Sequence, residues 1–146
     1  MKTKSLGERS NAFAIKAEVS NPQAKAFVFS EQKTMYGGKN IAKGDTIFIF
    51  ASENEGGSGL IASGIVTSVE ATPKKVKVVR QTPRVSITVA RRALAKRRLG
   101  RSELKPFSDW KDGRPESELN FKFYRQATNK IVRISDEAAV FLRGFF

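Results

Sequence analysis

The chain contains no cysteine and no histidine in its 146 residues. Because a disulfide needs two cysteines, none can form, and a reducing cytoplasm is the expected location. Without cysteine and histidine the protein also cannot build a Ser-His-Asp triad, a Cys-His dyad or an ordinary zinc site. The carboxylates show no spacing typical of a magnesium site. We therefore expect a binding protein that uses no cofactor, and an enzyme is the weaker hypothesis.

Long apolar runs are also missing. No segment approaches the roughly 20 apolar residues of a membrane-spanning helix, so we expect no membrane partner. The basic N-terminus lacks the apolar core of a secretory signal. Hydrophobic residues still make up 40% of the chain, and 11 of them are Phe, which predicts a packed globule. We expect a flexible tail at 1–10 followed by a single domain at 11–146.

Acidic residues are scarce in one part of the chain. Between Ala71 and Lys105 the sequence has twelve Lys or Arg residues and a single acid, Glu103. This segment carries +11 of the formal net charge of +13, so the rest of the chain is nearly neutral. A basic stripe on a neutral body is typical of proteins that bind the phosphate backbone of nucleic acid. The alternative is a solvated face that only keeps the protein soluble.

The hydrophobic pattern predicts mostly strands. They are predicted at 13–19, 26–30, 46–50, 60–69, 76–79, 85–89, 120–126 and 130–135. The segment 109–117 is predicted as loop, 90–100 as a basic helix that Gly100 ends, and 136–146 as a closing helix that Ser135 caps. The fold class is therefore α+β, a curled mixed β-barrel of about five to seven strands with a few short helices.

A polar, glycine-rich loop, ASENEGGSG, joins the strands predicted at 46–50 and 60–69. It is longer than a tight hairpin turn requires. Because it follows directly on a strand end, we interpret it as the rim of a ligand pocket, and an ordinary mobile loop is the alternative for 55–59. Gly64, inside the second of these strands, predicts a β-bulge or a close backbone approach.

Three motifs, taken in order, resemble the EVE domain, a member of the PUA-like superfamily whose relatives include the YTH and ASCH domains. EVE proteins begin with a strand that ends in Lys-Ser-Glu-Pro, and FVFSEQ resembles it at Ser30 and Glu31. A Gly-Asp pair, an aromatic strand, a polar loop and a Gly-Ile-Val strand then follow, and 44–70 has the same order.

The third motif of the family is a Val-Arg-Gln strand that leads to a Val-Ser and a helix. The stretch 123–135 resembles it at Arg125, Gln126 and Ser135, with Thr-Asn-Lys where the family has Arg-Leu-Ser. The resemblance covers 26–146. It implies a curled barrel with a pocket between strand ends that accepts one flipped-out, often modified base.

Such a pocket needs hydrogen bonds to a base edge and a surface for stacking, but no proton transfer. The candidate pocket residues are Ser30, Glu31, Tyr36, Ser52, Glu53, Asn54, Trp110, Arg125 and Gln126. Ser30 and Glu31 could instead cap a turn, and Trp110 could cover the barrel edge. The residues expected to hold the phosphate backbone are Lys74, Lys75, Lys77, Arg80, Arg91, Arg92, Arg97, Arg98 and Arg101.

The leading hypothesis is thus a nucleic-acid-binding module that reads a modified or flipped-out base. Its partner would be modified DNA or RNA, with an effector protein as a further candidate partner. One alternative is an ASCH- or PUA-type RNA binder that recognises structure without selecting a modification. The other is a magnesium-dependent hydrolase or nuclease that uses Glu53, Asp109 and Asp112.

Overall fold

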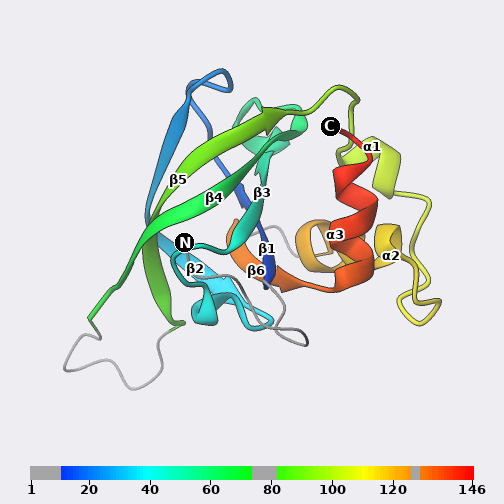
Figure 1. The fold of residues 1–146 in the computed structure, drawn as a ribbon. Coiled ribbons are helices and arrows are strands. Elements are labelled where there is room, and N and C mark those ends of the chain that lie inside the picture. Colours follow the sequence, from blue (N-terminus) through cyan, green and yellow to red (C-terminus); the bar gives the residue numbers. More distant parts are fainter. Residues whose placement is uncertain (1–10, 74–81, 126–128) are drawn as a thin grey trace, which may run out of the picture.

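The computed structural model describes residues 11–73, 82–125 and 129–146. Within these residues, six strands close into a barrel in the order β1-β3-β4-β5-β2-β6 (Figure 1). They are β1 (Ala12–Ala17), β2 (Ala26–Met35), β3 (Thr46–Ala51), β4 (Gly59–Ala71), β5 (Arg84–Leu94) and β6 (Lys130–Ile134). β1 runs parallel to β3, β2 runs parallel to β6, and the other neighbours are antiparallel. The expected mixed α+β barrel is confirmed.

Short helices complete the described fold. They are the 3₁₀ turns η1 (Gly38–Asn40) and η2 (Glu53–Glu55), and the helices α1 (Arg101–Leu104), α2 (Pro115–Tyr124) and α3 (Asp136–Arg143). The three α-helices lie together on one side of the barrel (Figure 1). Apolar side chains of α2 and α3, such as Phe123 and Leu142, pack there with Phe48 and Phe50 of β3. None of the described helices is long and apolar enough to span a membrane.

β1 is covered on both of its faces. The alternation of apolar and charged residues predicts a half-buried strand, but all six residues of β1 are buried. Phe13 and Ile15 point into the barrel core, while Ala12 and Ala14 belong to the cluster under the helices. Lys16 shares this second face, and its Nζ donates a hydrogen bond to the carbonyl oxygen of Phe123 at 2.7 Å.

The hairpin of β3 and β4 forms as predicted. Gly64 lies where the pairing of β4 with β5 shifts register, between Ser63 and Gly64. A Cβ atom at this position would lie 2.5 Å from Cγ1 of Val89 and 2.6 Å from the carbonyl oxygen of Ala90. Such distances are too short for any side chain, so the predicted bulge and close backbone approach are both confirmed.

Two predicted elements are wrong. The segment 90–100 is not a helix, because β5 continues to Leu94 and its last residues complete the pairing with β4. The segment 120–126 is not a strand, because α2 extends to Tyr124 from Pro115, inside the stretch expected to be loop. Phe121 and Phe123 alternate like strand residues, but packing of Phe123 under the helices makes this segment part of a helix. The tail at 1–10 and the strand predicted at 76–79 lie outside the described residues.

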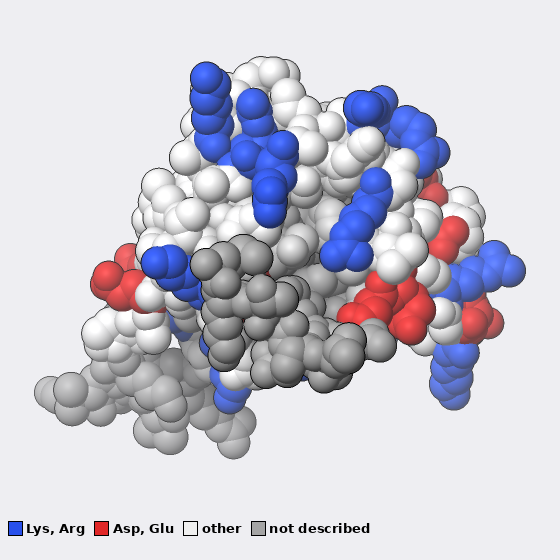
Figure 2. Space-filling model, viewed as in Figure 1, with Lys and Arg blue, Asp and Glu red and all other residues white. Residues whose placement is uncertain are grey.

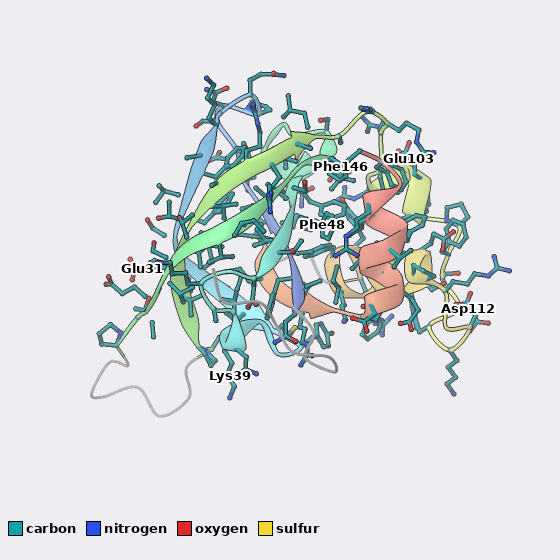
Figure 3. All side chains as sticks on the ribbon, viewed as in Figure 1. Glu31, Lys39, Phe48, Glu103, Asp112 and Phe146 are labelled. Atoms are coloured by element: carbon teal, nitrogen blue, oxygen red, sulfur yellow. The ribbon has the colours of Figure 1, made fainter. Side chains whose placement is uncertain are left out.

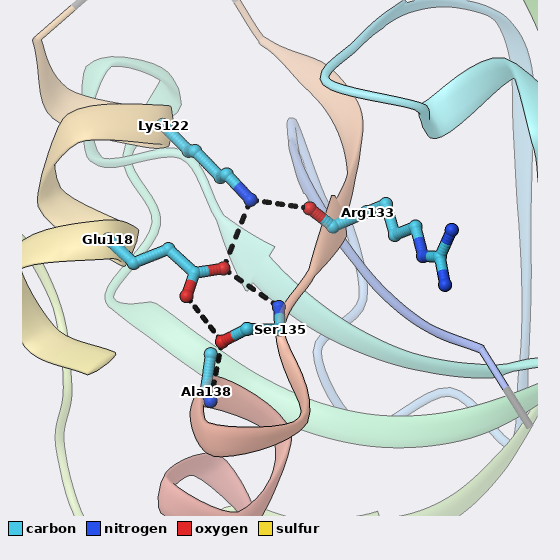
Figure 4. Close-up of polar contacts among 5 residues, drawn as sticks. All are labelled: Glu118, Lys122, Arg133, Ser135 and Ala138. Atoms are coloured by element: carbon cyan, nitrogen blue, oxygen red, sulfur yellow. Dashed lines mark hydrogen bonds and ion pairs between the residues drawn. The ribbon is translucent and has the colours of Figure 1, made fainter. Parts of the chain in front are cut away.

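The helices are joined to β6 through one carboxylate (Figure 4). Glu118 of α2 accepts hydrogen bonds from the hydroxyl and the backbone N–H of Ser135, and from Nζ of Lys122 at 3.0 Å. Lys122 also donates to the carbonyl oxygen of Arg133 at 2.8 Å. Ser135 caps α3 as predicted, since its Oγ accepts from the N–H of Ala138. This junction fixes α2 and α3 relative to the barrel.

Candidate functional site

One end of the barrel lies where β2 extends beyond the start of β6. These two strands pair only at Thr34 with Ile131 and Met35 with Val132, while β2 pairs with β5 from Ala26 onward. Since β6 begins only at Lys130, the first part of β2 has no partner in β6, at the barrel end where β1 and β3 also end. A cavity of about 380 Å³ lies at this end, within the range of small-molecule pockets. This strand-end depression is lined by Glu31, Gln32, Lys33, Asn54, Glu55, Arg84 and Asn129.

A bulge in β2 forms one wall of the strand-end depression. The pairing with β5 shifts register between Phe29 and Gln32, and Glu31 has a φ of 48°, in the left-handed region. The N–H of Glu31 donates to Oγ of Ser86 at 2.8 Å, and its carbonyl oxygen accepts from Nη1 of Arg84 at 3.0 Å. Its exposed carboxylate makes no polar contact with the described residues. A left-handed non-glycine residue is strained, and such strain makes Glu31 a candidate functional position.

The loop between β3 and β4 forms the opposite wall, and Glu53 fixes it in place. One carboxylate oxygen of Glu53 accepts from the hydroxyl of Tyr124 at 2.9 Å, and the other accepts from the N–H of Arg101 at 2.6 Å. Nη2 of Arg101 also donates to Oδ1 of Asn54 at 3.1 Å. Glu53 thus ties the loop to α1 and α2, and its carboxylate is occupied. Ser52 is buried, and its hydroxyl has no partner among the described residues.

Two buried lysines lie next to this end of the barrel. Lys16 of β1 and Lys130 of β6 are directly opposite each other in the antiparallel pair, and they are 1% and 2% exposed. Burial lowers the pKa of both ammonium groups, and that of Lys130 falls to about 8, with the charge of Lys16 as second cause. Burial, followed by the nearby Glu53, raises the pKa of Tyr124 and keeps its hydroxyl protonated. Lys130 follows Asn129 directly in the chain, but its Nζ lies 6.0 Å from the centroid of the Phe123 ring and its side chain does not line the depression.

The aromatic candidates lie in another place. The ring centroid of Tyr36 is 6.0 Å from that of Phe121, and the centroid of Trp110 is 5.3 Å from it. The guanidinium of Arg125 lies 5.9 Å from the Phe121 ring. We name Tyr36, Trp110 and Phe121 the aromatic cluster. Figure 3 shows Glu31 on the barrel side of the molecule and Asp112, in the loop of Trp110, on the helix side. The structure therefore does not bring Trp110 to Glu31.

The described arginines of the basic stripe mostly have internal partners. Arg91 donates to the carbonyl oxygen of Gln23 at 2.7 Å, which holds the loop between β1 and β2. Arg97 donates to the carbonyl oxygen of Gly144 at 2.7 Å, and Arg98 lies 3.5 Å from the carboxylate of Glu103. Arg92 is exposed on β5. Among the candidates, Lys74, Lys75, Lys77, Arg80 and Gln126 lie outside the described residues.

A second hollow lies on the other side of the loop between β3 and β4. Lys96, Arg97 and Arg98 line it together with Gln23 and Ser58, and we name it the basic depression. Basic side chains gather over the upper part of the face in Figure 2, whereas acidic side chains gather lower down, at the foot of α3. Three residues of the basic stripe, Lys96, Arg97 and Arg98, thus lie together in the turn after β5 instead of in the predicted helix.

Sequence reasoning missed Lys16, Lys130, Asn129 and Lys33. No sequence pattern identifies a lysine as buried. The position of Asn129 depends on where β6 begins beside β2. The carboxylates of the nuclease hypothesis serve the fold: Asp109 accepts from the N–H of Lys111 and Asp112 accepts from that of Arg114. Within the described residues, no group of three or more carboxylates could hold a metal ion.

Solved structures resemble this architecture along almost the whole chain. Human THYN1 protein in complex with 5-methylcytosine-containing DNA matches with a TM-score of 0.64 and 16% identity, over 92% of this chain and 96% of that chain. The DUF55 domain of human thymocyte nuclear protein 1 matches with a TM-score of 0.60 and 14% identity, over 91% and 96%. A hypothetical protein from Leishmania major matches with a TM-score of 0.59 and 16% identity, over 93% and 94%. No protein-family model and no curated protein matches the chain.

The chain therefore shares the fold of human THYN1 protein and of the DUF55 domain of human thymocyte nuclear protein 1. The likeness covers 92% of the chain, so it extends beyond 26–146 into the residues before Ala26. The first strand of the barrel is β1, which ends in Lys16-Ala17 and is followed by Glu18. Ser30 and Glu31, which the resemblance placed in a first strand, belong to the second strand, β2.

Proposed function

We propose that this EVE-like domain binds nucleic acid and accepts one flipped-out, modified base in the strand-end depression. The observation that carries the proposal is this depression at the end of the barrel, which a strained bulge at Glu31 borders. The likeness of fold to a protein in complex with 5-methylcytosine-containing DNA supports the same ligand class. Extruding a base from a duplex costs a few kcal/mol, and a pocket that hydrogen-bonds the base edge offsets that cost.

Three lining residues supply the hydrogen-bonding groups. The Glu31 carboxylate accepts from an exocyclic amino group, as on cytosine or adenine. The amides of Asn54 and Asn129 can both donate and accept. Oδ1 of Asn54 already accepts from Arg101, so its NH₂ is the group offered to a base. The depression can therefore distinguish base edges without any catalytic group.

The phosphates on either side of the base would contact the cations around these hollows. Lys33 lines the strand-end depression, and Lys96, Arg97 and Arg98 line the basic depression across the loop. Arg97 is held in place by Gly144 and by the ring of Phe145, 4.4 Å from its guanidinium. Such contacts position the backbone and carry no sequence information.

A binding screen tests the proposal. Oligonucleotides of DNA and RNA that carry 5-methylcytosine, another modified base or no modification would be titrated with the protein, and fluorescence anisotropy would be measured. We expect tighter binding to one modified base. Glu31→Gln should change the preferred base, because an amide replaces a pure acceptor, with a loss of about 1–3 kcal/mol for the original ligand.

Glu70→Gln is the matched control, since Glu70 is also an exposed strand glutamate and the change in charge is the same. It should bind as the unchanged protein does. Equal affinity for modified and unmodified RNA would contradict the base-reading part and favour recognition of RNA structure. Metal-dependent cleavage of the oligonucleotides would instead support the nuclease hypothesis.

A further inference from the structure

We propose that the aromatic cluster of Tyr36, Trp110 and Phe121 is a second contact for nucleic acid, on which unpaired bases of a single-stranded segment stack. This inference rests on the proposed function, because it takes the same class of ligand. It differs from the proposed base pocket in location and in binding mode. The cluster lies at α2 and not at the strand-end depression, and it would stack bases without reading their edges.

The three rings form a continuous surface that stays partly open to solvent. Phe121 lies in the middle and contacts Tyr36 on one side and Trp110 on the other, in tilted arrangements. Tyr36 is 38% exposed and Trp110 is 39% exposed, so their rings are supported by Phe121 but not covered. Ring faces held in this way are what successive bases need for stacking.

The backbone at Tyr36 is strained. Glu31 and Tyr36 are the two non-glycine residues with positive φ in the part of the chain that the structure describes, and Tyr36 has a φ of 51°. Gly37 follows with a φ of 86°, so the chain turns sharply just after the ring. The strain does not serve to bury Tyr36, which remains exposed. Strained positions of this kind concentrate at ligand contacts, and here one borders each of the two proposed sites.

Cations lie close to the aromatic cluster. Nζ of Lys122 lies 5.7 Å from the Tyr36 ring centroid, and the guanidinium of Arg125 lies 5.9 Å from that of Phe121. Arg133 and Lys122 also line a hollow next to Tyr36. Rings flanked by cations suit a polyanion whose bases are exposed, which is single-stranded nucleic acid.

The same hollow also contains two carboxylates, Glu118 and Asp136. Glu118 already accepts from Ser135 and from Lys122, so its charge is matched within the junction of the helices (Figure 4). Asp136 is the first residue of α3, where the positive end of the helix dipole lies. Lys122 is used in the ion pair with Glu118, so Arg133 in the hollow and Arg125 beside the Phe121 ring are the cations that can attract a phosphate.

The chain itself carries the probe, because Trp110 is its only tryptophan. A short oligothymidine strand would be titrated while tryptophan fluorescence and anisotropy of the labelled strand are both recorded. A base stacked on Trp110 should quench its emission in step with binding. The same oligonucleotide annealed into a duplex should quench much less, since its bases are paired and stacked among themselves.

Variants then locate the contact. Trp110→Ala and Tyr36→Leu should each weaken single-strand binding by about 5- to 150-fold. Trp110→Phe should restore most of it, because a ring remains. Val140→Ala is the control, since Val140 is a 66% exposed apolar residue of α3 and is not part of the cluster. The unchanged protein provides the fluorescence result even if Trp110→Ala fails to fold.

Binding of oligothymidine without quenching, together with unchanged affinity of Tyr36→Leu, would overturn this inference. Selectivity for a modified base, and its dependence on Glu31, would then still stand. Conversely, quenching that survives in Glu31→Gln, without any modified-base preference in the unchanged protein, would uphold the aromatic cluster and contradict the base pocket. Binding of no oligonucleotide at all would overturn both.

Discussion

Two buried lysines place positive charge where burial destabilises it. Lys16 and Lys130 face each other across β1 and β6, nearly without solvent contact, although like charges directly opposite in a sheet are destabilising. Lys16 is stabilised by the Phe123 carbonyl oxygen at the C-terminal end of α2 and by the Tyr124 ring, 4.8 Å from its Nζ.

This pair predicts a pH dependence of stability. The pKa of Lys130 is about 8 in the folded protein against 10.5 for an ordinary lysine. Between these values the unfolded state binds more protons, so the contribution of Lys130 to stability rises with pH there and is constant below pH 8. Urea unfolding should show the difference in free energy of unfolding between the unchanged protein and Lys130→Met shifting by roughly 1–3 kcal/mol over this range.

Lys111→Met is the control, because Lys111 is an exposed lysine of a loop. Its difference from the unchanged protein should stay constant over the same pH range. A constant difference for Lys130→Met as well would mean that Lys130 keeps an ordinary pKa in the folded state.

At the scale of elements, the helices depend on the barrel more than on their own propensity. α2 and α3 have ten and eight residues, too short to be stable alone in water. They are held by burial of residues such as Phe123 and Leu142, and by the junction of Glu118 with Ser135. The aromatic cluster includes Phe121 of the same helix α2, so its geometry depends on this junction.

Ser135→Ala should therefore destabilise the protein. The substitution removes the side-chain cap of α3 and the hydroxyl that donates to Glu118, so we expect a loss of about 1–2 kcal/mol in thermal or urea unfolding. Ser102→Ala is the control, because Ser102 is an exposed serine in α1, and it should change stability by less than about 0.5 kcal/mol. Equal effects of the two substitutions would contradict the role of the junction.

At the scale of the whole molecule, the distribution of charge sets where a polyanion would be attracted. Basic side chains gather on one part of the surface, and the loop between β3 and β4 separates the strand-end depression from the basic depression. Arg97 and Arg101 also hold the C-terminus and this loop, so their substitution would mix structural and ligand effects. Lys96 and Arg98 are the better probes, since both are exposed.

Replacing Lys96 and Arg98 with Gln should weaken binding to modified and unmodified oligonucleotides alike. The slope of log affinity against log salt should fall by roughly 0.9 on duplex DNA for each phosphate that the variant no longer neutralises. Arg114→Gln is the control, because Arg114 is exposed in the loop before α2. An unchanged slope in the double variant would show that the basic depression does not bind phosphates.

The sequence alone determined the barrel class, the hairpin of β3 and β4, the bulge at Gly64 and the cap at Ser135. These follow from local patterns: alternation of apolar residues, a glycine where no side chain fits, and a serine before a helical run. Charge composition likewise predicted a basic surface without any knowledge of the fold.

Tertiary structure decided the rest. The segment 90–94 forms a strand because β4 lies beside it. Phe123 belongs to a helix because that helix buries it against β3. Glu31 and Asn54 line one depression because β2 and the loop after β3 meet at the same end of the barrel. Trp110 and Tyr36 both contact Phe121 because of how α2 packs. Side chains far apart in the chain meet only through such long-range packing, and no local pattern encodes those distances.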